Sequence, residues 1–201
     1  MPPKGITSRS GRADTSSMGG RLGAGRYVAG IAACLTLGFF AFVRGTRVPL
    51  LGLVDLGFHE LGHLLSYPLP DVATAAMGSI TQVAVPVGLA LYFLLARRDL
   101  LGGGTCFAWA ASSAQDVSVY VADAPYQRLE LIGGEHDWAL VLGPDHLDLL
   151  GSAHTIATVV RGLGVLLVLV GLACCAAGLR RAVGPKPSRP IPALGAADMW
   201  R

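Results

Sequence analysis

Five long apolar runs dominate this chain of 201 residues and limit what it can fold into. Each run approaches the length of about 20 residues that a helix needs to cross the hydrocarbon core of a bilayer. Helices are expected in such runs because a helix satisfies its own backbone hydrogen bonds in lipid. The runs cover residues 27–43, 48–67, 77–96, 101–122 and about 155–179.

The composition favours the same class of protein. Hydrophobic residues make up 52% of the chain and charged residues only 14%, whereas roughly a quarter of the residues in an ordinary soluble domain are charged. The formal net charge of +3 lies mostly in the ends, so it bears on membrane orientation and gives no reason to expect a nucleic-acid partner. We therefore expect an all-α, polytopic bundle of about five transmembrane helices in a cell membrane. The Ala, Gly, Leu and Val content suggests a bacterial source.

The polar ends divide the chain into three parts. We expect a disordered basic tail at residues 1–25, a transmembrane domain at 26–180 and a second disordered basic tail at 181–201. Both tails and the Arg97–Arg98 pair favour the cytoplasm, and the acidic loop 123–154 favours the other side. Five crossings cannot put both tails on one side. Either one run is re-entrant, or one basic tail is translocated.

The second apolar run contains a His-Glu-x-x-His motif at His59, Glu60 and His63. Two histidines four residues apart lie on one face of a helix, so both imidazoles can reach one metal ion. Glu60 is then placed to take a proton from a metal-bound water. Polar side chains inside a membrane are costly unless they have a use. The alternative is a chance match, with both histidines satisfied by hydrogen bonds inside the bundle.

A catalytic zinc site needs a third protein ligand. Asp116 and Asp123 share one stripe of the fourth run, and Asp116 lies level with His63 if the second and fourth runs are parallel helices. Asp123 lies about 10 Å further along the axis. Asp116 is therefore the preferred third ligand, with Asp123 and His136 as rivals.

The loop segment 133–138 contains two glycines followed by Glu135, His136, Asp137 and Trp138. The glycines permit a tight turn, and the His-Asp pair is a candidate ligand or a partner that orients a ligand. An interfacial turn anchored by Trp138 is the alternative.

Four further residues in the apolar runs bear on this site. Asp55, one turn before His59, could accept the second N–H of that ring. Gly52 and Gly62 would let a neighbouring helix approach closely. Gln82 in the third run either lines the cavity or binds the substrate backbone, or it forms a hydrogen bond between helices, and the sequence favours neither interpretation.

The motif inside an apolar run, with an aspartate-bearing run two helices later, resembles the site-2 protease family of intramembrane zinc metalloproteases. The resemblance covers about residues 48–123. It implies that a distal aspartate completes the zinc site and that the enzyme cleaves membrane-embedded substrates.

The expected function is that of an intramembrane zinc-dependent peptidase acting on a membrane protein or peptide. Glu60 would be catalytic, and His59, His63 and Asp116 would bind Zn²⁺. One alternative is a zinc-dependent membrane lipid amide hydrolase of the ceramidase-like type. The other is a metal-binding membrane scaffold without activity.

Overall fold

The computed structural model describes residues 11–131 and 135–184, and every regular element in these residues is helical. The prediction of an all-α fold is therefore confirmed. The elements are α1 (Gly11–Gly38), a π-helical turn (Phe39–Arg44), α2 (Leu51–Ser66), α3 (Asp71–Leu95), α4 (Leu100–Asp123), the short α5 (Asp137–Leu142), a 3₁₀ turn (Leu150–Ser152) and α6 (Ala153–Val183).

Three of these segments are long and apolar enough to cross a membrane: Gly23–Arg44, Asp71–Leu95 and Leu150–Val183. The other two predicted spans are also helices. With 16 residues, α2 is only about 24 Å long, less than the roughly 30 Å of a hydrocarbon core. By contrast, α4 has 24 residues, enough for a crossing, but it carries many polar residues.

The helix ends differ from the predicted boundaries. Inside the segment 1–25 predicted to be disordered, α1 already begins at Gly11, and α6 runs to Val183, past the predicted domain end at residue 180. Residues 1–10 and most of the predicted C-terminal tail lie outside the described residues. On its N-terminal side α3 starts directly after Pro70, because proline fits the start of a helix and stops one that reaches it from before.

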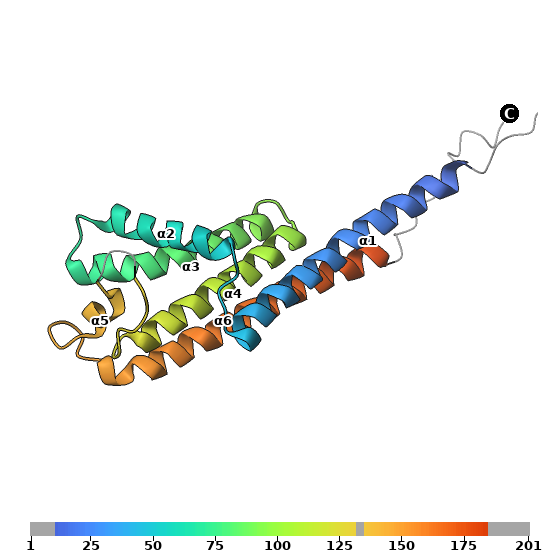
Figure 1. Ribbon diagram of the computed structural model, residues 1–201. Helices are drawn as coiled ribbons and strands as arrows, with labels where there is room; N and C mark the ends of the chain where they lie inside the picture. The colour runs from blue at the N-terminus through green and yellow to red at the C-terminus, as the bar shows by residue number, and fades with distance from the viewer. Residues whose placement is uncertain (1–10, 132–134, 185–201) are drawn as a thin grey trace, which may run out of the picture.

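At the centre of the bundle lies α4 (Figure 1). It packs against α3 on one side and α6 on the other, α1 packs against α4 and α6, and α2 lies over α3. About half of α4 is buried, mostly as Ala, Ser and Gly residues that permit close helix contacts. A central helix of this kind can carry polar side chains because its neighbours shield them from the surroundings of the bundle.

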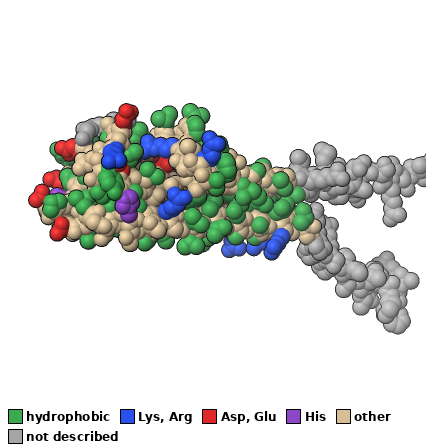
Figure 2. Space-filling model, turned by 60° about the horizontal axis from the view of Figure 1, so that its bottom comes forward, with side chains coloured by type: hydrophobic (Ala, Val, Ile, Leu, Met, Phe, Trp, Pro, Cys, Tyr) green, Lys and Arg blue, Asp and Glu red, His purple; other side chains and the backbone are tan. Residues whose placement is uncertain are grey.

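The short helix α5 lies at the end of the bundle where α2 is connected to α3 (Figure 1). It packs against α3 and α4, and Val141 and Leu142 are buried there. In Figure 2, acidic side chains gather at this end of the molecule, and Lys and Arg side chains lie along its middle and toward the other end.

Candidate metal centre

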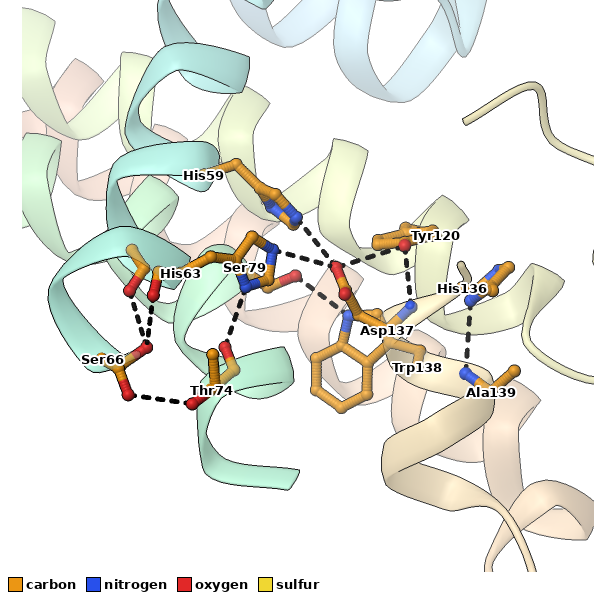
Figure 3. Close-up of polar contacts among 11 residues, drawn as sticks. His59, His63, Ser66, Thr74, Ser79, Tyr120, His136, Asp137, Trp138 and Ala139 are labelled. Carbon is orange, nitrogen blue, oxygen red and sulfur yellow. Dashed lines mark hydrogen bonds and ion pairs between the residues drawn. The ribbon is translucent and has the colours of Figure 1, made fainter. Parts of the chain in front are cut away.

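Both motif histidines lie on one face of α2, as the four-residue spacing predicts. Their rings are 4.7 Å apart between centroids and nearly perpendicular. His59 is buried and His63 is partly buried. Figure 3 shows both rings directed toward the same point beside α3 and α5.

Two glycines allow α2 and α3 to approach closely at this level. A Cβ atom on Gly62 would collide with the backbone of Met77, so the predicted close approach at Gly62 is confirmed. At Gly52 a Cβ atom would meet only the Arg47 side chain, at 3.7 Å, so the predicted close approach of a helix there is wrong. A Cβ atom on Gly78 of α3 would lie 2.6 Å from His63 Nε2 and 2.7 Å from His59 Nε2. The missing side chain of Gly78 therefore leaves space next to both ring nitrogens.

The third group at this point is Asp137, the first residue of α5. Its Oδ2 atom lies 3.0 Å from His59 Nε2 and 3.3 Å from His63 Nε2 (Figure 3). Among the described residues, His59, His63 and Asp137 form the group whose candidate ligand atoms all lie within 4.8 Å of one another. These three residues could hold a metal ion.

The two distances from Asp137 to the histidines are compatible with a tetrahedral metal site as well as with direct hydrogen bonds. Two ligand atoms about 2.1 Å from a zinc ion, at a tetrahedral angle, are about 3.4 Å apart. The two distances from Asp137 Oδ2 to the histidine nitrogens are close to this value. Three protein ligands leave the fourth position for water or substrate, as in catalytic zinc sites.

The far side of the His63 ring is held by the backbone of α3. His63 Nδ1 lies 2.9 Å from the backbone carbonyl oxygen of Thr74. A carbonyl only accepts, so Nδ1 carries a hydrogen, and Nε2 is the nitrogen that faces Asp137. A backbone carbonyl on the other ring nitrogen is the kind of partner that orients metal-binding histidines.

Tyr120 of α4 holds Asp137 in place. The Tyr120 hydroxyl lies 3.2 Å from Asp137 Oδ2 and accepts a hydrogen bond from the Asp137 backbone N–H at 3.0 Å. The next residue, Trp138, attaches the start of α5 to α3. Its indole N–H donates a hydrogen bond to Ser79 Oγ at 3.0 Å (Figure 3). Trp138 therefore joins α5 to α3.

The preferred third ligand, Asp116, is not part of this group. Asp116 lines the same cavity as both histidines, but its carboxylate lies 3.9 Å from Arg47 Nε. A position along the helix axis does not determine which side of the histidines a residue occupies. The structure has Asp137, and not Asp116, beside both rings.

The two rival ligands, Asp123 and His136, face one another instead. His136 Nε2 lies 3.4 Å from Asp123 Oδ2, and His136 Nδ1 accepts the backbone N–H of Ala139 at the start of α5. Burial lowers the pKa of His136 and favours its neutral form. Asp123 also accepts from the backbone N–H groups of Arg128 and Leu129. This pair joins the loop after α4 to α5.

A cavity of about 300 Å³ opens beside the three candidate ligands. Glu60, the predicted catalytic residue, lines it, as do Gln82, Arg47 and Asp116. Of the alternatives left open for Gln82, the structure has the residue lining the cavity. Glu60 is exposed, so its carboxylate is accessible to molecules that enter the cavity.

Asp55 has a different partner from the one predicted. Its Oδ1 atom accepts from the Trp109 indole N–H at 2.7 Å and from Ser113 Oγ at 2.9 Å. Both partners belong to α4. Asp55 therefore fastens α2 to α4 one turn before His59.

Comparisons with known proteins identify no relative of this chain. No family model, no curated protein and no solved structure matches this chain. The resemblance to site-2 proteases thus depends on the motif residues alone.

The sequence contains a signal for Asp137, because a His-Asp pair follows two glycines in the segment 133–138. His136 of this pair is the predicted rival ligand. Its neighbour Asp137 is the residue next to the motif histidines. The short helix α5, which directs adjacent side chains to different sides, decides between them.

Proposed function

We propose that this protein is a zinc-dependent peptidase of the cell membrane that hydrolyses peptide bonds in membrane-associated proteins or peptides. The observation that carries the proposal is the grouping of His59, His63 and Asp137, whose candidate ligand atoms lie within 4.8 Å of one another. Gly78 allows both histidine rings to lie against α3 at this point. Glu60 of the same motif lines the adjoining cavity. Two neutral imidazoles and a carboxylate are ligands that zinc prefers.

The roles of the residues follow from this arrangement. Zinc held by the three ligands would supply a Lewis acid and lower the pKa of a bound water. Glu60 would accept a proton from the attacking water and then donate it to the leaving amine nitrogen. Thr74 and Tyr120 hold His63 and Asp137 in position, and such contacts are worth 10- to 100-fold in metal affinity.

We further propose that α2 and α4 complete a membrane bundle of about five helices around the three apolar spans. The Asp55 contacts to α4 support this assignment, because they fix the short α2 against the central helix. The cavity would then lie among helices inside or at the edge of the bilayer. A substrate reaching it there would be a membrane protein or peptide.

The Glu60→Gln variant tests this function. Glutamine is nearly isosteric with glutamate but accepts no proton at neutral pH, so the variant should keep its zinc and lose at least about 100-fold in rate. The measurement is mass spectrometry of new protein termini in membranes from cells that express the wild type or the variant. His146→Gln, an exposed change outside the ligand group, is the control.

The outcomes separate the three candidate functions. New termini in wild-type and control membranes, missing with Glu60→Gln, support a peptidase. Changes in amide-linked lipids without new termini would favour a lipid amide hydrolase. Identical termini and lipids in all strains, with zinc bound, would favour a scaffold without activity.

A further inference from the structure

Gln82 of α3 is a buried polar residue whose side chain has no hydrogen-bond partner within residues 23–131 and 135–184. Only 7% of its surface is exposed, and it lines the cavity beside the candidate metal ligands. Buried amide groups are nearly always paired with protein, water or ligand. The cavity is therefore the place where the Gln82 amide meets its partner.

The helix geometry puts this amide close to the metal position. Gln82 follows Gly78 by four residues, so both lie on the same face of α3. Long side chains of a helix lean toward its N-terminus, and Gln82 therefore leans toward Gly78. The Cβ position of Gly78 is less than 3 Å from both histidine Nε2 atoms.

Apart from the candidate ligands, two other side chains that line this cavity can donate hydrogen bonds. The Tyr120 hydroxyl already contacts Asp137. Arg47 approaches Asp116 only through Nε, at 3.9 Å, and its side chain is 69% exposed. Gln82, by contrast, is a buried donor in the wall of the cavity beside the candidate ligands.

We propose that Gln82 is a substrate-binding residue, whose side-chain N–H donates a hydrogen bond to the carbonyl oxygen of the peptide bond being cleaved. The inference depends on the proposed peptidase function. In the reaction, a water oxygen bonds to the carbonyl carbon and the C=O electron pair moves to the carbonyl oxygen. The C–N bond then breaks, and the proton that Glu60 took from water goes to the amine. Gln82 gains and loses no proton.

A donor at this position favours the transition state more than the substrate. Negative charge grows on the carbonyl oxygen as water adds, and a fixed N–H group interacts most strongly with that charge. The helix backbone of α3 keeps the donor in position before substrate arrives.

The test uses acetohydroxamate, a small metal ligand that presents a carbonyl oxygen. The protein is purified in detergent and loaded with Co²⁺, and binding is followed by the visible spectrum of the metal. In the Gln82→Met variant the N–H donor is removed at similar side-chain volume, and acetohydroxamate affinity should fall about tenfold. Affinity for 2-mercaptoethanol, which has no carbonyl oxygen, should stay within about twofold.

A matched control is Gln115→Met. Gln115 is buried on α4, outside the cavity lining, and its Oε1 atom accepts from Ser118 Oγ. The control should bind both ligands like the wild type. If Gln82→Met fails to fold, Gln82→Glu replaces it in the test. Glutamate is nearly isosteric with glutamine and offers a carboxylate instead of an N–H donor, so Gln82→Glu should lose at least as much acetohydroxamate affinity as is expected for Gln82→Met.

Unchanged acetohydroxamate affinity in Gln82→Met with bound cobalt would overturn the role of Gln82 and leave the metal site intact. An equal loss for both ligands would also overturn it, because the change would then act on the site as a whole. A wild-type protein that binds no cobalt would refute the proposed function itself.

Discussion

At the scale of single residues, the candidate metal site depends on the hydrogen bonds that orient His63 and Asp137. The Thr74 carbonyl accepts a hydrogen bond from His63 Nδ1, so a hydrogen of this ring lies on Nδ1. The Tyr120 hydroxyl contacts both the carboxylate and the backbone N–H of Asp137. These contacts orient the ligands before any metal arrives, so removing one should weaken metal binding without removing a ligand.

Tyr120→Phe is the variant that tests this orientation. It removes one hydroxyl and keeps the ring, so we expect zinc affinity to fall roughly tenfold while the far-UV circular dichroism stays unchanged. Tyr126→Phe is the control, because the Tyr126 hydroxyl contacts His154 outside the ligand group. Equal zinc affinities in the two variants, measured by competition with a chelating dye, would show that Tyr120 does not orient Asp137.

At the scale of elements, the site depends on how closely α2 packs on α3. Gly62 and Gly78 remove side chains where the two helices meet. The hydrophobic runs predict these helices, and the sequence pattern predicts Gly62 as a point of close approach.

The third ligand was harder to predict, because Asp137 belongs to a short helix within a polar loop. The helical period and the rise per residue predict the positions of Asp116 and Asp123 along α4. They contain no information on where α5 packs against the other helices. That docking depends on contacts between distant residues, such as Trp138 with Ser79 and Tyr120 with Asp137. The motif pair and the helices were predictable from local sequence, and the complete ligand set was not.

Gly78→Ala tests the packing argument. The added methyl group would occupy the space beside both Nε2 atoms, so zinc affinity should fall at least about tenfold. Gly88→Ala on the same helix is a matched control, since a Cβ atom there meets nothing within 4 Å. The idea fails if the two alanine variants bind zinc equally well, as measured by equilibrium dialysis.

At the scale of the whole molecule, the direction of each helix bears on the orientation problem. Tyr27 packs at Gly178 and Gly38 packs at Val168, so α1 and α6 are antiparallel. Gly30 packs at Leu101 and Cys34 contacts Gly104, so α1 runs parallel to α4. Asp55 contacts Trp109 and His59 lies beside Tyr120, so α2 also runs parallel to α4. Because α1 and α2 run in the same direction, the chain does not turn back between them. The first and last described residues therefore lie toward the same end of the molecule (Figure 1).

This arrangement favours a re-entrant run over a translocated tail. We expect both termini and Arg98 in the cytoplasm and the acidic loop on the other side. Green fluorescent protein fused to either terminus should therefore fluoresce. In a background without the native cysteines, Asp145→Cys should react with a membrane-impermeant maleimide added to cells, and Arg98→Cys should not. Labelling of Arg98→Cys alone would reverse the orientation.

The central claim is that His59, His63 and Asp137 bind one zinc ion, and zinc content measures it most directly. Purified wild type should hold about one zinc per chain by elemental mass spectrometry. The His59→Ala, His63→Ala double variant and Asp137→Ala should hold almost none, while Asp116→Ala keeps the wild-type content. Equal zinc in wild type and the double variant would contradict the site, and loss of zinc from Asp116→Ala but not from Asp137→Ala would contradict the third ligand.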